Sequence, residues 1–586
     1  MPLSTQEVHA RSLERAYQLE ISNFIAQNSI ARLWAKDLTL WPAPATLQKT
    51  KIANLNWLDL PQQMHGYMLQ VIARTEALEK HGFETLVFVG MGASNLVADT
   101  IQRMSVAKRG RRFFVLDSID PAAIQKLDGV LDLRTTLFVF ATKSGKLIET
   151  HALLLHFLDM LRGVGITNPG GHFIAVTEKN SYLARLAVQY RFREVFHDPP
   201  GIQGRFSSLI HFGLLLSAVG QIDPAILSSR GIAMQNACGP QSAPQTNPAL
   251  TLAAFLAAGV AEGKDRLFLA SSPALASVTR SLAQLIGFST GKERQGIVPI
   301  FGTLPCALEL SYDGCLVAAL ALRGELDDAA AKQLNEHLAQ KSAPSVIIEI
   351  DGPEDLGAEL FKWELATALI CSRLGVNPFD QPDAQRSRAA AQRGLEDIVA
   401  RREFQLPTIR LNDSGIGLRA ETVTRQEIST RNLSEAFRTF LDLRRADGYL
   451  AILAFLEESP EIWASLERLR TQLEARVRIP VQLSFGPRYL HYLGQVYKGG
   501  PAKGLFVILT AEPGRDIPVP GAGYSFGQLQ TALARGDFEA LYQRNQHVLW
   551  LHFAEGTEQG FGRLDGALAS GARSSSPDRL IHPPLL

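Results

Sequence analysis

The sequence predicts an α/β protein whose sheets are mainly parallel. The first observation is a set of short, continuously apolar runs, which are typical of strands buried on both faces of a sheet. The second is that helix-like stretches separate these runs, an alternation that indicates βαβ units. In the first half of the chain the expected strands are residues 85–90, 112–116, 136–141 and 173–176, and the expected helices are residues 94–104, 121–127, 148–161 and 181–190.

A second block with the same alternation follows a linker at residues 239–247. This linker is rich in proline and polar residues, which mark loops between periodic segments. The expected strands of the block are residues 266–270, 315–322 and 345–350, and its expected helices are residues 248–261, 273–286, 359–374 and 383–401. We therefore expect a second α/β domain.

The last third of the chain follows a second linker at residues 405–415 and shows a different order. Its expected strands are residues 449–456, 481–485, 504–510 and 548–553, and its expected helices are residues 461–476 and 526–544. This β-α-β-β-α-β order predicts a ferredoxin-like split βαβ pattern and a smaller α/β layer. Because the first 65 residues suggest helices and loops, the predicted domains are residues 1–65, 66–238, 248–403 and 416–586.

Composition narrows the function classes. A net charge of +1 over 586 residues gives no reason to expect nucleic acid or an anionic membrane as a partner. The four cysteines (Cys238, Cys306, Cys315 and Cys371) lie far apart, which suits a reducing compartment better than a disulfide framework or a zinc ribbon. No signal peptide is visible, and no apolar run reaches the roughly 20 residues of a membrane span. We expect a cytoplasmic protein.

The loop at residues 90–95 has the chemistry of an anion-binding turn. It runs Gly-Met-Gly-Ala-Ser-Asn between an expected strand and an expected helix, with Gly92 and Ser94 at the turn. Glycine permits a tight turn, and a helix N-terminus presents free N–H groups. Phosphate or sugar binding and an ordinary strand-to-helix turn both remain open for this loop.

The loop at residues 142–147 follows the expected strand at residues 136–141 and leads into the expected helix at residues 148–161. Hydroxyls and amines gather there on Thr142, Lys143, Ser144 and Lys146. Such groups at a helix start suit a phosphate. The alternative is that Ser144 caps the helix while the lysines are solvated. Because α/β sheets bind ligands at the carboxyl ends of their strands, two such loops together favour a ligand site.

These two loops resemble those of sugar isomerase (SIS) domains, namely the GxGGS turn and the S-K-S-G-T-T-x-E-T phosphate loop. Glu149 and Thr150 match the end of the second loop. The chain departs at Ala93, which replaces a glycine, and at Lys146 and Leu147, which replace two threonines. Lys146 offers a charged contact in place of the lost hydroxyls. The resemblance implies flavodoxin-like, parallel-sheet domains.

Further segments resemble the phosphoglucose isomerase family. Residues 204–207 match its GGR-[FY]-S segment, whose arginine, here Arg205, lies near the sugar and stabilises the enediolate. Residues 377–382 match a segment whose glutamine, Gln381, reaches phosphate. Seven residues later Arg388 replaces a lysine. Residues 491–495 match H-S-x-G-Q, whose histidine, His491, opens the sugar ring, and here a tyrosine replaces the serine. Taken without its motif, an isolated histidine is more often a surface or capping residue.

The resemblance runs from about residue 31 to the end and is nearest to the isomerase half of bacterial transaldolase–phosphoglucose isomerase fusion proteins. We expect no transaldolase half, since this chain leaves no room for a (β/α)8 barrel of about 250 residues. The resemblance implies a glucose 6-phosphate or fructose 6-phosphate ligand held between the first two domains, no cofactor or metal, a role in glycolysis and gluconeogenesis, and a possible homodimer.

One position conflicts with catalysis. In the family, the position of Phe288 normally holds a glutamate, the base that moves a proton between two sugar carbons. Phenylalanine has no titratable group, although the segment around it, residues 284–292, is otherwise similar to the family. A positioned base contributes roughly 10²–10⁴-fold to rate. Glu293 is a possible replacement.

Three hypotheses remain. The chain is an isomerase that interconverts glucose 6-phosphate and fructose 6-phosphate through an enediolate, without a metal. Alternatively it is a catalytically impaired or inactive sugar-phosphate-binding protein, a sensor or partner, because Phe288 and Arg388 replace the usual glutamate and lysine. The third is a scaffold that binds nothing. Phe288 as simple core packing and Arg388 as part of a solvated helix face are the structural alternatives.

Overall fold

The computed structural model describes residues 4–42, 55–79, 82–104, 112–207, 223–303, 314–325, 328–401, 411–413, 415–420 and 432–570. These residues fall into two units. Unit 1 comprises residues 1–117 and 131–381, and unit 2 comprises residues 118–130 and 382–586. The four-part division expected from the sequence stays a prediction. Among the described residues, no helix combines the length and apolarity needed to cross a membrane.

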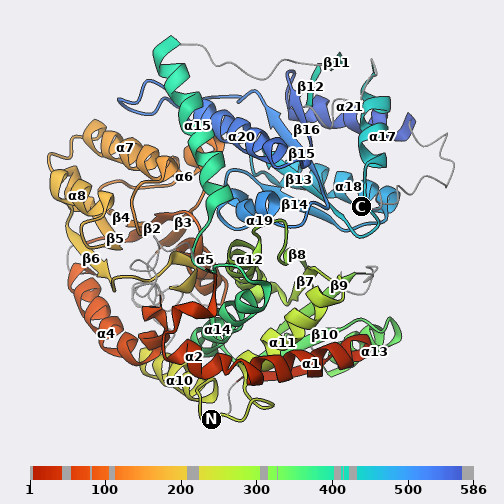
Figure 1. Ribbon diagram of the computed structural model, residues 1–586. Coiled ribbons are helices and arrows are strands. Elements are labelled where there is room, and N and C mark those ends of the chain that lie inside the picture. The colour runs from red at the N-terminus through yellow and green to blue at the C-terminus, as the bar shows by residue number, and fades with distance from the viewer. Residues whose placement is uncertain are drawn as a thin grey trace. The chain divides into compact units, whose positions relative to one another are not determined.

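Unit 1 contains two five-stranded sheets. The first has the order β3-β2-β4-β5-β6, and all its neighbouring strands are parallel. Its strands are β2 (Thr85–Gly90), β3 (Arg112–Leu116), β4 (Thr136–Ala141), β5 (Phe173–Glu178) and β6 (Glu194–Asp198), and its helices are α4 (Leu60–Glu79), α5 (Ala93–Met104), α7 (Ile148–Gly163) and α8 (Tyr182–Gln189) (Figure 1). When the five strands are numbered along the chain, their order in the sheet is 2-1-3-4-5, the flavodoxin-like arrangement. The strand order changes direction between β2 and β4, and we call this place the reversal point of the sheet.

The second sheet of unit 1 has the order β1-β10-β9-β7-β8. Its strands are β1 (Thr5–His9), β7 (Arg266–Ser271), β8 (Val298–Thr303), β9 (Cys315–Leu322) and β10 (Ser345–Ile350). Strands β7 to β10 are parallel, whereas β1 is antiparallel to β10. The prediction of only helices and loops in the first 65 residues was therefore wrong at β1. That strand is polar and lies at a sheet edge, so no apolar run marks it.

Helices complete unit 1. They are α1 (Glu14–Ala26), α2 (Ser29–Trp34), α10 (Pro224–Ala237), α11 (Pro248–Ala261), α12 (Ala276–Thr290), α13 (Asp328–Gln340) and α14 (Leu356–Leu374). Local sequence explains several of their ends. The Asn247 side chain accepts hydrogen bonds from the first-turn N–H groups of α11, next to Pro248, and Gly375 ends α14 in a left-handed conformation.

Unit 2 contains a six-stranded sheet of order β11-β12-β16-β15-β13-β14. Its strands are β11 (Leu411–Asp413), β12 (Ile416–Ala420), β13 (Tyr449–Phe455), β14 (Val481–Phe485), β15 (Gly504–Ala511) and β16 (His547–Phe553). Strands β13 to β16 are all parallel. The ferredoxin-like prediction was therefore wrong, because that fold requires antiparallel neighbours. The order β14-β13-β15-β16 is again 2-1-3-4.

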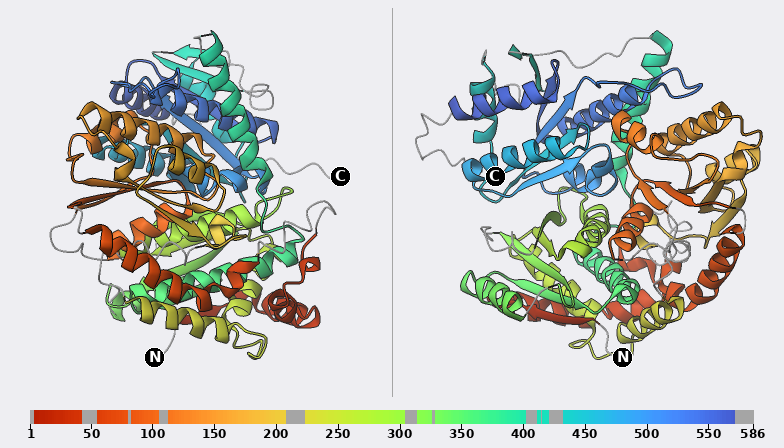
Figure 2. Two further views of the ribbon diagram at one scale, coloured as in Figure 1. Left: turned by 90° about the vertical axis from the view of Figure 1, so that its left-hand side faces the viewer. Right: turned by 180° about the vertical axis from the view of Figure 1, so that it is seen from behind.

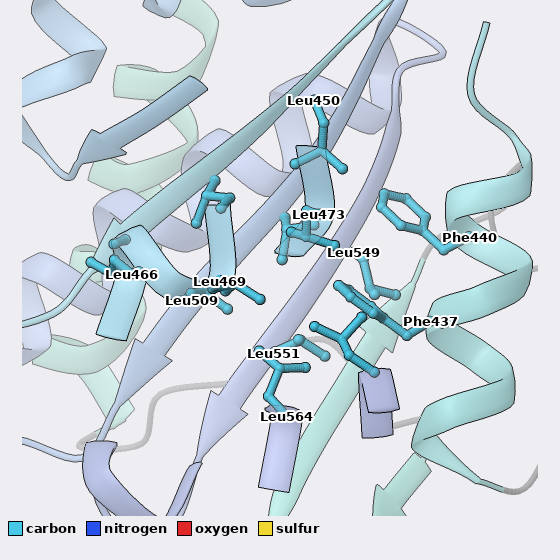
Figure 3. Packing of buried hydrophobic residues seen from close by; sticks show 14 of the residues in the cluster. Phe437, Phe440, Leu450, Leu466, Leu469, Leu473, Leu509, Leu549, Leu551 and Leu564 are labelled. Carbon is cyan, nitrogen blue, oxygen red and sulfur yellow. The ribbon is translucent and has the colours of Figure 1, made fainter. Parts of the chain in front are cut away.

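Helices flank this sheet on both faces. They are α6 (Pro121–Asp128), α15 (Pro382–Arg401), α17 (Leu433–Asp442), α18 (Pro460–Val477), α19 (Gly494–Gly499), α20 (Phe526–Gln543) and α21 (Thr557–Ser570). Helix α6, although early in sequence, belongs to this unit and is the orange helix beside the blue elements (Figure 2). On one face, α17, α18 and α21 bury a leucine and phenylalanine cluster against β13, β15 and β16 (Figure 3). On the other face, Phe538 of α20 packs against Trp550 at 5.6 Å.

Short 3₁₀ turns carry several site residues. The turns are η1 (Arg11–Leu13), η2 (Leu38–Leu40), η4 (Asn56–Asp59), η5 (Pro169–His172), η6 (Gly204–Phe206), η7 (Pro273–Leu275), η9 (Pro353–Asp355) and η10 (Arg488–His491). The predicted α/β class with parallel sheets is confirmed.

Candidate functional site

The two predicted anion-binding loops flank the reversal point of the first sheet. One follows β2 and the other follows β4, and these strands are hydrogen-bonded neighbours. At the first loop, Gly92 adopts a left-handed φ of 94°, and the Asn95 side chain donates to the Leu116 carbonyl at 3.2 Å. Ser94 lies in the first turn of α5, but its side chain is outside the described residues. Reversal points are the usual ligand positions in such sheets.

The loop after β4 is shaped by its own hydroxyls. The Thr142 Oγ1 accepts from the Gly145 N–H at 3.4 Å, and the Ser144 Oγ accepts from the Lys146 N–H at 3.3 Å. The Thr177 hydroxyl holds the loop from β5, with 2.6 Å to the Thr142 carbonyl. Ser144 therefore does not cap α7.

The N-cap of α7 is Leu147, which makes no side-chain cap hydrogen bond. The first-turn N–H groups of α7 consequently lack the side-chain acceptor that serine, threonine or aspartate provides at most helix starts. Lys146 and Ser144 are exposed beside them. An anion at this helix start would accept from these N–H groups and be favoured by the helix dipole.

Lys143 lies in the same loop, but its side chain extends toward the ends of β5 and β6. Its ammonium is 3.9 Å from the Glu178 carboxylate and 4.0 Å from the Asp198 carboxylate. Sequence reasoning did not single out Asp198, because β6 has no apolar run to mark it as a strand.

Arg205 is buried in η6 and is held by four hydrogen bonds. Its Nε donates to the Ser289 Oγ at 3.0 Å, its Nη1 to the Gln381 Oε1 at 3.2 Å, and its Nη2 to the carbonyls of Pro378 and Asp380. Since a guanidinium has five N–H groups, one of them has no acceptor among the described residues. Burial lowers the pKa of Arg205 to about 10, and the Asp380 carboxylate opposes this shift, so the group stays charged at neutral pH. Gln381 accepts with its amide oxygen, so its amide N–H groups are not used in this bond.

Lys292 contacts the turn at residues 377–381, which also accepts hydrogen bonds from Arg205. Its side chain is 5% exposed, its ammonium is 2.8 Å from the Asp380 Oδ1, and it also donates to the Asn377 carbonyl. Burial, followed by the positive charge of Arg205, lowers the pKa of Lys292 to about 8, and the Asp380 carboxylate opposes these effects. The ion pair of Lys292 and Asp380, which sequence reasoning missed, holds the turn whose carbonyls accept hydrogen bonds from Arg205.

Phe288 lies inside α12 and is 2% exposed, next to Ser289, which accepts from Arg205. The possible replacement, Glu293, is exposed at the tip of a tight turn, where Lys292 and Gln295 pair and Glu293 has a φ of 55°. Position 288 therefore carries no carboxylate, and the carboxylate of Glu293 lies outside helix α12.

The remaining two predicted site residues lie in unit 2. The Arg388 Nη2, on α15, is 3.4 Å from the His491 Nδ1, on η10. His491 is 4% exposed, and so is Tyr492, which replaces the family serine. Arg388 is therefore engaged with the predicted catalytic histidine, so the alternative of a wholly solvated helix face does not hold for it.

A buried carboxylate ties together the elements that carry Arg388 and His491. Asp537 of α20 pairs with Lys498 of α19, and both side chains are fully buried. It also accepts from the Ser387 hydroxyl at 3.1 Å and from the Tyr489 hydroxyl. Ser387 precedes Arg388, and Tyr489 lies in the turn that contains His491. Nothing in the local sequence distinguished Asp537.

No protein-family model matches the chain. Among curated proteins, the glucose-6-phosphate isomerase of Acaryochloris marina is 26% identical over 413 residues, which cover 63% of this chain and 76% of that protein. The glucose-6-phosphate isomerase of Thermosynechococcus vestitus is 25% identical over 442 residues, which cover 67% and 82% respectively.

Among solved structures, a hypothetical protein from Thermus thermophilus superposes with a TM-score of 0.57 at 21% identity, covering 66% of this chain and 99% of that one. This likeness concerns the fold. The finer resemblance to the transaldolase fusion proteins stays a prediction. The resemblance inferred from the motifs is confirmed, and over about two thirds of its length this chain is similar to curated glucose-6-phosphate isomerases.

Proposed function

We propose that the chain binds a hexose 6-phosphate, either glucose 6-phosphate or fructose 6-phosphate, through the first sheet of unit 1. The observation that carries this proposal is the start of α7, whose N–H groups lack a side-chain cap beside the exposed Lys146 at the reversal point of the sheet. The ligand identity is supported by the names of the curated relatives. One further N–H group of Arg205 and the amide N–H groups of Gln381 would donate to the same ligand.

Isomerisation by this chain is expected to be impaired. Interconversion of the two sugars needs an acid/base for ring opening, a base that carries the proton between C2 and C1, and a cation beside the enediolate. His491 and Arg205 have the chemistry for the first and third roles. The second role lacks its carboxylate, because Phe288 is apolar and Glu293 is exposed in its turn. We therefore favour a sugar-phosphate-binding protein with little turnover, such as a sensor or a partner of an active isomerase.

A competent isomerase is the second candidate. The observation that favours it is the Arg388–His491 contact of 3.4 Å in unit 2, since both the ring-opening histidine and a neighbouring cation are retained.

Calorimetry and a coupled assay separate the candidates. We expect the wild-type protein to bind fructose 6-phosphate and to turn it over at least about 10²-fold more slowly than its curated relatives. Phe288→Glu is expected to raise the rate, whereas the matched control Phe288→Gln, which has similar size without a charge, is not. Failure of both hexose 6-phosphates to bind at millimolar concentration would refute the binding proposal. Wild-type turnover equal to that of the relatives would establish the second candidate.

The homodimer and the cytoplasmic location implied by the resemblance stay predictions. Light scattering of the purified protein tests the first, and cell fractionation tests the second.

A further inference from the structure

The ends of three neighbouring strands bring a lysine and two carboxylates together in unit 1. Lys143 follows β4, Glu178 ends β5 and Asp198 ends β6, and Glu178 and Asp198 are register partners. The Lys143 ammonium is 4.0 Å from the Asp198 Oδ2 and 3.9 Å from the Glu178 Oε1. Both separations exceed the 2.7–3.2 Å typical of a hydrogen bond. The cluster is therefore charged and close, but not hydrogen-bonded.

The Lys143–Asp198 pair is buried and unsatisfied. The Asp198 side chain is 1% exposed, and among the described residues neither of its oxygens has a hydrogen-bond partner. The Lys143 ammonium is also buried and has none within the same described ranges. Burying polar groups without hydrogen bonds is costly, so such groups in folded proteins usually meet water, an ion or a ligand.

The charges of the pair reflect this environment. Burial lowers the pKa of Lys143, and the carboxylates of Asp198 and Glu178 oppose the shift. Burial raises the pKa of Asp198, and the Lys143 ammonium opposes that shift. The pKa of Tyr67, on α4, is raised by burial and then by the nearby negative charge of Asp198. Burial is thus the largest influence on the pKa of each partner.

We propose that Lys143 and Asp198 form a subsite that binds one hydroxyl of the sugar, an inference that rests on the hexose 6-phosphate function proposed above. A hydroxyl both donates and accepts, so it can accept from the ammonium and donate to the carboxylate. With 4.0 Å between the Lys143 Nζ and the Asp198 Oδ2, an oxygen placed about 2.8 Å from each atom completes both bonds. The pair thus determines specificity for a polyhydroxy ligand.

The position of the pair fits a phosphate on the loop that follows β4. Strand β6 lies two strands away from β4, and each step across a sheet is about 4.8 Å. A phosphate at the α7 start would therefore be well separated from Asp198, so that repulsion between the two anions is small. The sugar carbons would extend along the strand ends toward Asp198, where Lys143 reaches from the other side.

This arrangement selects among sugars. An analogue that lacks the bound hydroxyl leaves Lys143 and Asp198 unpaired, and sites that hydrogen-bond a substrate hydroxyl reject such analogues strongly. An amino sugar phosphate brings a second ammonium beside Lys143 and is disfavoured by repulsion. The predicted ligand class is a hexose phosphate whose sugar moiety is uncharged and polyhydroxy.

The test is calorimetry with fructose 6-phosphate, glucose 6-phosphate and the monodeoxy derivatives of glucose 6-phosphate. We expect Asp198→Ala to weaken binding of the parent sugars at least tenfold. One monodeoxy sugar is expected to bind the wild type at least tenfold more weakly than glucose 6-phosphate does. The same two sugars are expected to bind Asp198→Ala with equal affinity. Glu178→Ala is the matched control, because that half-exposed carboxylate is equally near Lys143; it should change affinity less than threefold.

Two outcomes overturn the inference while the proposed function stands. Equal affinity of Asp198→Ala and wild type for the parent sugars would mean that the pair holds resident water only. A hydroxyl effect that is the same in both proteins would mean that the hydroxyl binds elsewhere. If the wild type binds no hexose 6-phosphate, the proposed function itself fails. Circular dichroism checks folding, and if Asp198→Ala does not fold, Asp198→Asn and Lys143→Met carry the same comparison with the same criteria.

Discussion

The first sheet of unit 1 and the sheet of unit 2 share the 2-1-3-4 order but differ in charge where their direction reverses. In unit 1 the loops after β2 and β4 carry glycines, hydroxyls and the cations Lys143 and Lys146. In unit 2 the corresponding strands, β13 and β15, are followed by Glu457, Glu458 and Glu512. Burial raises the pKa of Glu457, and nearby acidic groups add to the shift.

The difference teaches that topology and chemistry are separate choices. The strand order creates a place where a ligand can reach several strand ends, whichever residues stand there. Only the unit 1 loops suit a phosphate, since carboxylates repel it. Unit 2 instead uses the turn after its edge strand β14 and the start of α15, where His491 and Arg388 meet, and supports them with a buried ion pair.

The largest effect on stability is expected when the buried ion pair of unit 2 is removed. Asp537→Ala leaves the Lys498 ammonium buried without its counter-charge, which is expected to lower the free energy of unfolding by about 3–5 kcal/mol. Denaturant unfolding measures this loss. Glu539→Ala, two residues along the same helix, removes a surface pair with Arg393 and should cost about 0–1 kcal/mol. Equal losses for the two variants would show that the buried pair is not the main support.

The next effect concerns the buried cation of unit 1. Because the pKa of Lys292 is lowered from 10.5 to about 8, the unfolded chain binds more protons than the folded chain between these pH values. Stability should therefore rise between about pH 8 and 10.5, by roughly 3 kcal/mol at 1.36 kcal/mol per pKa unit. Unfolding followed against pH should show this rise in the wild type and not in Lys292→Met. A rise that survives in the variant would assign it to other groups.

A smaller effect is expected at the loop that follows β4. Gly145 has a φ of 68°, and an added Cβ would lie 2.3 Å from the Leu183 nitrogen. Gly165 has a φ of 80° and open space around it. Alanine in a left-handed conformation costs about 1–2 kcal/mol at either position, but only Gly145→Ala also forces the loop away from α8. We expect affinity for inorganic phosphate to fall in Gly145→Ala and to persist in Gly165→Ala; parallel losses would place the phosphate elsewhere.

The smallest effect is expected at the start of α7. Leu147→Thr restores a hydroxyl N-cap, which is worth about 1 kcal/mol, partly offset by lost apolar burial because Leu147 is half-buried. Thermal unfolding should show a small net stabilisation, and calorimetry should show weaker phosphate binding, because the threonine hydroxyl competes for the first-turn N–H groups of α7. Unchanged or tighter binding would mean that the phosphate does not use these N–H groups.

Local sequence predicted the apolar strands well, including the edge strands β3 and β14, but it missed the edge strands β1, β6 and β8 and did not predict the pairing. The runs at 85–90 and 136–141 coincide with β2 and β4, since a strand buried on both faces must be apolar throughout. The edge strand β6, with the sequence EVFHD, lacks such a run and was missed. The ferredoxin-like prediction failed because strand direction depends on which strands pair, and β14 pairs with β13 only, at the sheet edge.

The candidate site divides in the same way. Arg205, Gln381 and His491 were found from motifs, and Arg205 does contact Gln381. Asp198, Asp380 and Asp537 were not found, because each matters only through a lysine far away in sequence. Glu293, which sequence spacing left open as a replacement base, is placed in an exposed turn by its backbone conformation.

By itself, the sequence determined which stretches are apolar enough to be buried strands, which loops contain anion-binding residue types, and that position 288 has no proton to give or take. These are properties of residues and of their immediate neighbours. The tertiary structure alone decided that Lys143 faces Asp198 across three strand ends and that Lys292 holds the turn gripping Arg205. Such pairs form because burial removes water from charged groups, and only the folded chain brings them within reach of a partner.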